Sequence, residues 1–461
     1  MNLLLTADIG STFTKVTAID VRASAIIGTA RSFTTIETNV MDGFNAALKE
    51  LKKLCGAEKF SAMAASSSAA GGLKMVAVGL VPDLTVQAAK LAAANAGAKI
   101  QKAYAFELNQ SEIDEITALG PDMILLSGGA DGGNKSVIIH NAKALAASPL
   151  RCPIVAAGNK SAEDGLKTAL QDYPGEVMFR PNVMPEVGET NPLPAQSAIR
   201  DLFIKNIVSA KGLSELAALM SAEIVPTPVA VFEAAHLLSR GTKKTPGLGE
   251  LLVFDVGGAT TDVYSMAEGL PGRANVTLRG LKQPFAKRTV EGDLGLRYSL
   301  SSLAEAVDIE DEAARLGFPP AQLTDWIALC AGDPALVPKP GEAAKKIDDA
   351  LAAAAVRLSI ARHCGRLETF FSPLGQSFVQ TGKDLGGVPV VIGTGGPIIN
   401  AGQPAKVLAE AVYRTEDGGL LKPAAPKIMI DADYILAAMG LLSRLEPEAA
   451  LALMLEKIVQ A

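Results

Sequence analysis

The chain has 461 residues, which is too many for one ordinary hydrophobic core, so two or more domains are expected. Hydrophobic residues make up 49% of the chain and aromatic residues only 5%, so its cores must be aliphatic, which suits α/β packing. A net charge of -6 without a basic run argues against a nucleic-acid surface. No apolar stretch approaches the ~18 residues that span a membrane, so no membrane partner is expected.

The cysteines are isolated in the sequence, with no CxxC pair among Cys55, Cys152, Cys330 and Cys364. A zinc or iron–sulfur site within one chain is therefore not expected, although a cluster shared between two chains stays open. The N-terminus lacks a basic region, and Leu3–Leu5 is too short for a signal peptide. These features favour a reducing cytoplasm.

At the N-terminus, residues 3–16 predict a strand, a turn and a second strand. Asp8 ends the first strand, and Lys15 supplies a cation that could meet a phosphate. The turn itself holds three small residues, Gly10, Ser11 and Thr12. Glycine lets the backbone turn sharply and bring its N–H groups close to an anion.

Residues 251–265 repeat this strand, turn and strand, with Gly257 and Gly258 in the turn. The side chains that could take part are two hydroxyls and two carboxylates, Thr260, Thr261, Asp255 and Asp262. A carboxylate at the end of a strand can hold hydrated Mg²⁺. A buried β-hairpin with a polar tip is the alternative interpretation of this stretch.

A third strand, over residues 390–394, leads into the glycines Gly393, Gly395 and Gly396. Three strand–glycine turns, two of them preceded by aspartate, predict one nucleotide held between two halves of the chain. Further along from the second turn, Gly292 and Gly295 are expected to flank a helix start. Acidic groups there, Glu291 among them, could accept ribose hydroxyls, or could belong to a capped helix with solvated charges.

Residues 86–200 alternate strand and helix patterns, which implies right-handed crossovers and a parallel sheet. Ser111 is expected to cap one of the helices. The turn Gly128–Gly133 is either a ligand or partner surface or a structural tight turn. Residues 225–235 predict a proline-started helix with a small face, suited to close crossing at a hinge; an ordinary alanine-rich helix is the alternative.

The motifs resemble those of the actin–Hsp70–sugar-kinase superfamily. DIGSTFTK at residues 8–15 is similar to its first phosphate motif, DVGGATTD at 255–262 to its second, and GTGGP at 393–397 to its adenosine motif. Residues 226–235 and 433–442 resemble its two connecting helices. The resemblance implies an α/β fold with two actin-like, ribonuclease H-like lobes around a nucleotide cleft.

The lobes and insertions that this resemblance implies can be assigned along the whole chain. Lobe I would take residues 1–85 and, with a connecting helix, 201–248; lobe II would take 249–298 and 385–426. An α/β subdomain would be inserted at 86–200 and a helical subdomain at 299–384. Residues 427–461 would return to lobe I as a strand and helices.

Six motifs resemble a narrower group, the MutL family of glutamate mutase operons, which is unrelated to the mismatch-repair factor of the same name. They are DIGSTFTK, SSAAGGLKM, ILLSGGADGGN, RPNVMPE, RTVEGDLGLR and IGTGGP. This resemblance implies an accessory ATPase whose partners are the subunits of an adenosylcobalamin-dependent mutase or aminomutase. It would exchange damaged cobalamin for intact cofactor, as diol dehydratase reactivases do.

The motifs then imply roles for their residues. Asp8 and Asp255 would order Mg²⁺ through water, and Lys15 would neutralise the terminal phosphates of ATP. Asp262 or Asp8 would position the attacking water, and the sequence does not choose between them. The change between ATP and ADP would alter lobe closure, and residues 86–200 would dock on the mutase.

Three other functions remain open at this stage. A small-molecule kinase of the same superfamily needs an acceptor pocket with a catalytic carboxylate, and no stretch of the sequence indicates such a pocket. An electron-transferring activator of the 2-hydroxyacyl-CoA dehydratase type needs a cysteine cluster between two subunits, and no cysteine lies in a suitable glycine turn. A filament-forming scaffold of the actin kind is the third alternative, and formation of a homo-oligomer stays open.

Overall fold

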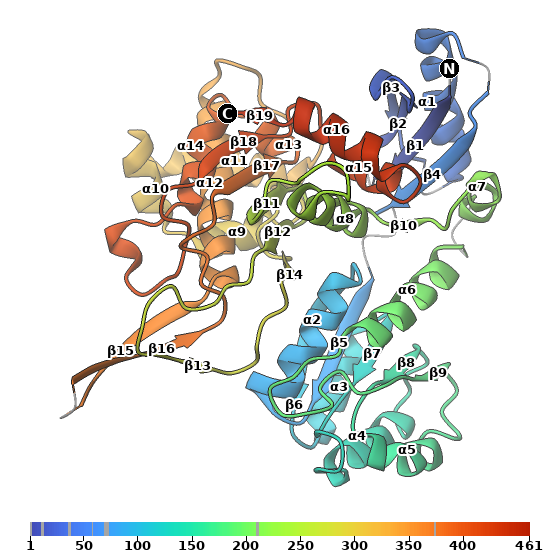
Figure 1. Cartoon of the computed structure of the whole chain (residues 1–461), viewed down its shortest axis with the longest axis vertical. Helices are drawn as coiled ribbons and strands as arrows, with labels where there is room; N and C mark the ends of the chain where they lie inside the picture. Colours follow the sequence, from blue (N-terminus) through green and yellow to red (C-terminus); the bar gives the residue numbers. More distant parts are fainter. Residues whose placement is uncertain are drawn as a thin grey trace. The chain divides into compact units, whose positions relative to one another are not determined.

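The computed structural model describes residues 2–10, 13–35, 38–57, 59–68, 73–208, 212–372 and 375–461 (Figure 1). The chain divides into two compact units. Unit 1 comprises Met1–Glu233, Gly280–Lys282 and Gly440–Ala449, and unit 2 comprises Ala234–Arg279, Gln283–Met439 and Ala450–Ala461. The chain passes from one unit to the other on either side of Gly280–Lys282 and within the helices α8 (Thr227–Arg240), α15 (Leu436–Ser443) and α16 (Pro447–Lys457).

The first sheet of unit 1 has the strand order β10-β4-β1-β2-β3. Its strands are β1 (Leu3–Ile9), β2 (Phe13–Asp20), β3 (Ala25–Phe33), β4 (Ala62–Ser67) and β10 (Val225–Pro226). β1 pairs antiparallel with β2, and β2 pairs antiparallel with β3, whereas β4 pairs parallel with β1, and β10 with β4. Alternate β1 residues such as Leu5 and Ala7 share a core with Phe44 of α1 (Val40–Cys55), so Asp8 lies on the opposite face.

The second sheet of unit 1 is parallel throughout its described pairings, as the alternating pattern predicts. It has the order β6-β5-β7-β8-β9. The strands are β5 (Lys74–Gly79), β6 (Lys99–Ala105), β7 (Met123–Leu126), β8 (Ile154–Ala156) and β9 (Val177–Phe179). Between them lie η1 (Pro82–Val86), α2 (Gln87–Asn95), α3 (Gln110–Leu119), α4 (Ser136–Ala146), η2 (Lys160–Ala162) and α5 (Glu163–Ala169), and α6 (Leu193–Val208) and α7 (Leu213–Leu219) follow.

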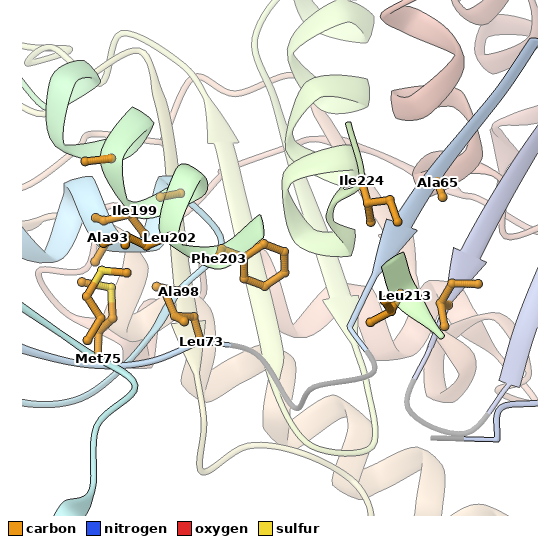
Figure 2. Close-up of a cluster of buried hydrophobic side chains, with 14 of the residues drawn as sticks. Ala65, Leu73, Met75, Ala93, Ala98, Ile199, Leu202, Phe203, Leu213 and Ile224 are labelled. Carbon is orange, nitrogen blue, oxygen red and sulfur yellow. The ribbon is translucent and has the colours of Figure 1, made fainter. Parts of the chain in front are cut away.

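Helices cover both faces of this parallel sheet (Figure 1). Met75 of β5 shares a core with residues of α2 and α6, and Figure 2 shows Ile199 and Leu202 of α6 beside Ala93 and Met75. The next residue, Val76, instead packs with α3, α4 and α5. The prediction that Ser111 caps α3 is wrong. Asn109 Oδ1 accepts a hydrogen bond from the Glu112 amide at 3.0 Å, and the Glu112 carboxylate accepts one from the Asn109 amide, also at 3.0 Å.

The main sheet of unit 2 has the order β14-β12-β11-β17-β18-β19. Its strands are β11 (Leu251–Val256), β12 (Thr261–Met266), β14 (Ala286–Glu291), β17 (Val390–Thr394), β18 (Lys427–Ile430) and β19 (Val459–Gln460). β11, β12 and β14 pair antiparallel, and β17 and β18 run parallel to β11. In the first sheet of unit 1, β1, β2 and β3 likewise pair antiparallel, and β4 and β10 run parallel to β1. This repeated order is ribonuclease H-like and confirms the predicted α/β fold class.

Helices α9 (Leu300–Ala306), α10 (Ile309–Leu316), α11 (Pro320–Gly332) and α12 (Ala343–His363) follow the hairpin of this sheet, and α12 packs on β12. Beyond α12, the last part of the range expected to be a helical subdomain, residues 299–384, forms two strands, because Thr369–Phe371 and Phe378–Val379 are strand-forming residues. These strands, β15 (Arg366–Ser372) and β16 (Gly375–Thr381), join β13 (Val276–Arg279) in a separate sheet. The remaining short helices are α13 (Gly396–Ile399), α14 (Pro404–Leu408), η3 (Ala409–Ala411) and η4 (Thr415–Asp417).

Within unit 1, α8 and α15 cross at very short distance. A Cβ atom on Gly440 would lie only 1.8 Å from the carbonyl oxygen of Ala230. Close beside this crossing, Arg444 donates to both carboxylate oxygens of Glu233, at 2.6 and 2.5 Å. The close crossing expected for the connecting helices is therefore present, and their hinge role remains a prediction. In the part of the chain that the structure covers, no helix combines the length and hydropathy of a membrane span.

Candidate functional site

The first candidate turn lies where β1 gives way to β2. Asp8, near the end of β1, accepts hydrogen bonds on Oδ1 from the Ser66 hydroxyl at 2.8 Å and the Thr227 hydroxyl at 2.6 Å. The amide of Gly10 donates to the carbonyl oxygen of Phe13 at 3.0 Å, which closes the turn. A Cβ at Gly10 would lie 2.7 Å from that oxygen, so the turn requires glycine. The predicted residues Ser11 and Thr12 lie outside the described residues.

The electrostatics of this turn suit a cation beside Asp8. Burial raises the pKa of Asp8, and the hydrogen bonds from Thr227 and Ser66 and the charge of Lys15 oppose the rise. Lys15 stands directly opposite Asp8 in the β1–β2 register, so both side chains project from one face of the sheet. A carboxylate that burial destabilises gains from a bound cation, which fits the predicted magnesium role of Asp8.

The second candidate turn, in unit 2, repeats the first in detail. Asp255 is the next-to-last residue of β11, and the amide of Gly257 donates to the carbonyl oxygen of Thr260 at 2.9 Å. In both turns the aspartate is followed, two residues later, by a glycine. The amide of that glycine donates a hydrogen bond to the carbonyl oxygen of the residue three positions further on. Asp255 stands opposite Asp262 on β12 and opposite Thr394 on β17.

The segment after β14 holds the second turn in place. Backbone amides of Arg297 and Tyr298 both donate to the carbonyl oxygen of Gly258, each at 2.8 Å. A Cβ at Gly295 would lie 2.3 Å from the carbonyl carbon of Ala259. The expectation that Gly292 and Gly295 flank a helix start is wrong: α9 begins at Leu300. Gly295 instead permits backbone contact with the turn.

The hydroxyls and the carboxylate of the second turn are engaged by protein groups. Thr261 is fully buried and donates to the carbonyl oxygen of Leu294 at 2.7 Å. Thr260 donates to Asp262 Oδ2 at 3.1 Å. The other oxygen of Asp262 accepts from Nε and Nη2 of buried Arg288, at 2.8 and 2.6 Å. Asp262 therefore sits in a buried ion pair, which a sequence pattern alone does not indicate.

Glu291 closes β14 and pairs with Arg362, whose Nη1 lies 2.8 Å from Glu291 Oε2. The same guanidinium also binds both oxygens of Asp293, at 2.7 and 2.8 Å. Burial raises the pKa of Glu291, and the hydrogen bond and charge of Arg362 oppose that rise. If Glu291 accepted hydrogen bonds from ribose hydroxyls, its carboxylate oxygens would have to bind the ribose and Arg362 at the same time.

The third candidate turn lies against the second, within unit 2. Gly393 is buried in β17, and Gly395 takes a φ of 89°. A Cβ on Gly395 would lie 2.2 Å from the carbonyl oxygen of Val256 and 2.7 Å from Asp255 Oδ1. Gly396, which starts α13, has open space at its Cβ position, with only an Asn400 atom at 4.0 Å. Gly395 therefore brings the third turn onto the end of β11.

The predicted site residues thus form two groups. Unit 1 holds Asp8, Gly10 and Lys15, and unit 2 holds Asp255, Gly257, Gly258, Thr260, Thr261, Asp262, Glu291, Gly393, Gly395 and Gly396. Sequence reasoning missed two partners. Thr227, at the start of α8, binds Asp8 from 219 residues away. Asp431, after β18, accepts from the Thr394 hydroxyl at 3.0 Å.

The acidic residues suit one metal class in particular. Among the residues that the structure describes, no three His, Cys, Asp or Glu side chains gather as a metal site. Mg²⁺ is commonly held by one or two carboxylates together with water and substrate phosphates. Asp8 and Asp255 fit that mode, because each sits at a glycine turn whose N–H groups can face an anion.

The repeated sheet and the repeated Asp–x–Gly turn define an actin-like α/β protein with two lobes. A family model described as "MutL protein" matches residues 4–458. A relative, "Protein MutL" of Clostridium tetanomorphum, is 44% identical over 464 residues, covering 100% of both chains. The chain belongs to the MutL family, as its motifs predict.

Solved structures resemble the chain more loosely. An acetone carboxylase in its nucleotide-free form aligns with 96% of this chain and 70% of its own, at 13% identity and a TM-score of 0.42. A ligand-bound xylulose kinase from Lactobacillus acidophilus aligns with 100% of this chain and 93% of its own, at 9% identity and a TM-score of 0.36. Because these TM-scores are low, the fold assignment rests on the strand order.

Proposed function

We propose that this chain is an ATP-binding accessory protein that reactivates an adenosylcobalamin-dependent mutase. The observation that carries the nucleotide part is the repeated turn, with Asp8 and Asp255 at equivalent strand positions and the same closing hydrogen bond after each. Two such turns from two similar sheets are what one ATP needs for its phosphates. The proposed cofactors are ATP or ADP with Mg²⁺.

The proposed division of work follows from the local chemistry. Backbone N–H groups of the turns bind phosphate oxygens, and Lys15 neutralises charge on the terminal phosphates. Bound Mg²⁺ would supply charge neutralisation between the phosphates, with Asp8 and Asp255 holding its water ligands. Because Asp262 is paired with buried Arg288, Asp8 is the better candidate to orient an attacking water.

The proposed partner is a cytoplasmic mutase of the glutamate mutase or aminomutase type. The MutL family membership and the motif resemblance support this part, and a change of nucleotide would drive release of damaged cobalamin. We propose that the parallel sheet of unit 1 docks on the mutase. Its carboxyl edge presents two exposed apolar side chains, Phe106 at 59% and Val187 at 73% exposure. Phe106 has a φ of 67°, and buried Asn141 binds its carbonyl oxygen at 2.9 Å.

The test is reactivation of a mutase whose cobalamin has been damaged by turnover, assayed with this protein in the presence and absence of ATP. Recovery of mutase activity only with ATP supports the proposal. Phe106→Asn should lower recovery while leaving ATP binding unchanged. The control is Leu54→Ser, because Leu54 is 66% exposed on α1, away from that edge. Phosphorylation of a sugar or acid without any mutase effect would contradict the proposal and favour a kinase.

A further inference from the structure

A row of charged side chains continues past Lys15 to the edge of the first sheet. Asp8 stands opposite Lys15, and Lys15 stands opposite Arg31 on β3. Residues directly opposite one another in a sheet project from the same face, so all three side chains share one face. Arg31 lies on the exposed side of β3, whereas its neighbour Ala30 faces α1 and is buried. No motif marks Arg31, because it lies outside the glycine turn.

The guanidinium of Arg31 is held beside the first turn. Its central carbon lies 5.2 Å from the centre of the Phe13 ring, within cation–π range. Phe13 in turn contacts Phe33, with ring centres 4.7 Å apart. The carbonyl oxygen of Phe13 accepts the hydrogen bond from Gly10 that closes the turn. The aromatic pair therefore fixes a cation next to the residue that completes the phosphate turn.

Lys15 and Arg31 can reach the same anion. Paired residues on neighbouring strands have Cα atoms about 5 Å apart, and both side chains are longer than that separation. Arginine also presents a planar fork that binds two phosphate oxygens at once, which lysine does not. We propose that Arg31 is a second phosphate-binding residue of unit 1, which contacts the terminal phosphate of ATP together with Lys15. Phe13 acts as its positioning residue. This inference rests on the proposed nucleotide function.

The proposal makes Arg31 specific for the third phosphate. Binding of ATP, ADP and AMP, each with Mg²⁺, is measured by isothermal titration calorimetry for the full chain. Arg31→Ala should weaken ATP binding about tenfold, since a charge-assisted hydrogen bond has that worth. The affinity for ADP should fall less than the affinity for ATP, and the affinity for AMP should be unchanged. Arg31→Lys should recover part of the loss, because it keeps the charge and not the fork.

Matched variants separate this role from a general effect of surface charge. Arg22 lies in the turn at the opposite end of the β2–β3 hairpin and is also exposed, so Arg22→Ala should bind ATP like the wild type. Phe13→Leu should weaken ATP binding in part, while Phe13→Tyr, which keeps the ring, should not. Circular dichroism of each variant checks that the fold is retained.

The outcomes are distinct. Equal ATP affinity for the wild type and Arg31→Ala overturns the role of Arg31 and leaves the proposed function standing. Equal losses for ATP and AMP also overturn it, because the effect would then not depend on the terminal phosphate. If the wild type itself does not bind ATP, the proposed function fails and this inference fails with it.

Discussion

Gly440 is the position in unit 1 where we expect an added methyl group to lower the free energy of unfolding most. A Cβ there would lie 1.8 Å from the carbonyl oxygen of Ala230, while ordinary contact begins at 3.4 Å. α8 and α15 would have to separate by about 1.6 Å, and neither backbone can move aside as a flexible side chain does. Overpacking costs about 1–3 kcal/mol. Against it stands a gain of about 1 kcal/mol in helix propensity. Because the clash is with backbone, we expect Gly440→Ala to lose about 2 kcal/mol.

The assay is urea unfolding followed by circular dichroism, with Gly332→Ala as the matched control. Gly332 ends α11 and has nothing within 4 Å of its Cβ position, so that variant should match the wild type or gain slightly. If Gly440→Ala unfolds at the same urea concentration as Gly332→Ala, the close helix crossing is not a source of stability. The reasoning would then be refuted.

Three further predictions concern unit 2. Asp262→Asn leaves the buried Arg288 charge without its carboxylate and should cost about 3–5 kcal/mol in urea unfolding monitored by the single tryptophan; a cost below about 1 kcal/mol would contradict this. Burial lowers the pKa of Lys383 from 10.5 to about 7. Between pH 7 and pH 10.5 the unfolded chain therefore binds more protons than the folded chain, so the free energy of unfolding should rise with pH over this range. Lys383→Met should flatten that rise, and an unchanged pH profile of the unfolding midpoint would count against the assignment. Gly395→Ala should destabilise the third turn, whereas Gly396→Ala should not, as thermal melts of the two variants would reveal; equal melts would exclude the close approach.

Local sequence was enough to find both Asp-bearing turns. A strand, an aspartate and a glycine fit within ten residues, and their hydrogen bonds close within the same segment. The parallel sheet of unit 1 was equally predictable, because alternating apolar strands and amphipathic helices admit few connections. Its order, with β5 between β6 and β7, was not, since every order has the same pattern along the chain.

What the sequence did not supply are contacts between distant segments. Thr227 reaches Asp8 only because β10 pairs with β4 and brings the start of α8 to that strand end. Arg288 reaches Asp262 because β14 pairs with β12. Gly295 looked like a helix-start glycine, and only the backbone of Ala259 beside it explains the residue. Periodicity predicts which face a residue takes and says nothing of its partner.

The central claim is that two Asp–x–Gly turns serve one nucleotide. Calorimetric titration of ATP with Mg²⁺ into the wild type, Asp8→Asn and Asp255→Asn tests this most directly, with Asp83→Asn as an exposed control on η1. The account predicts one ATP per chain, with binding strongly weakened by either of the two site variants and unaffected by the control. Two ATP per chain, each lost with a different variant, or no ATP binding at all, would contradict it.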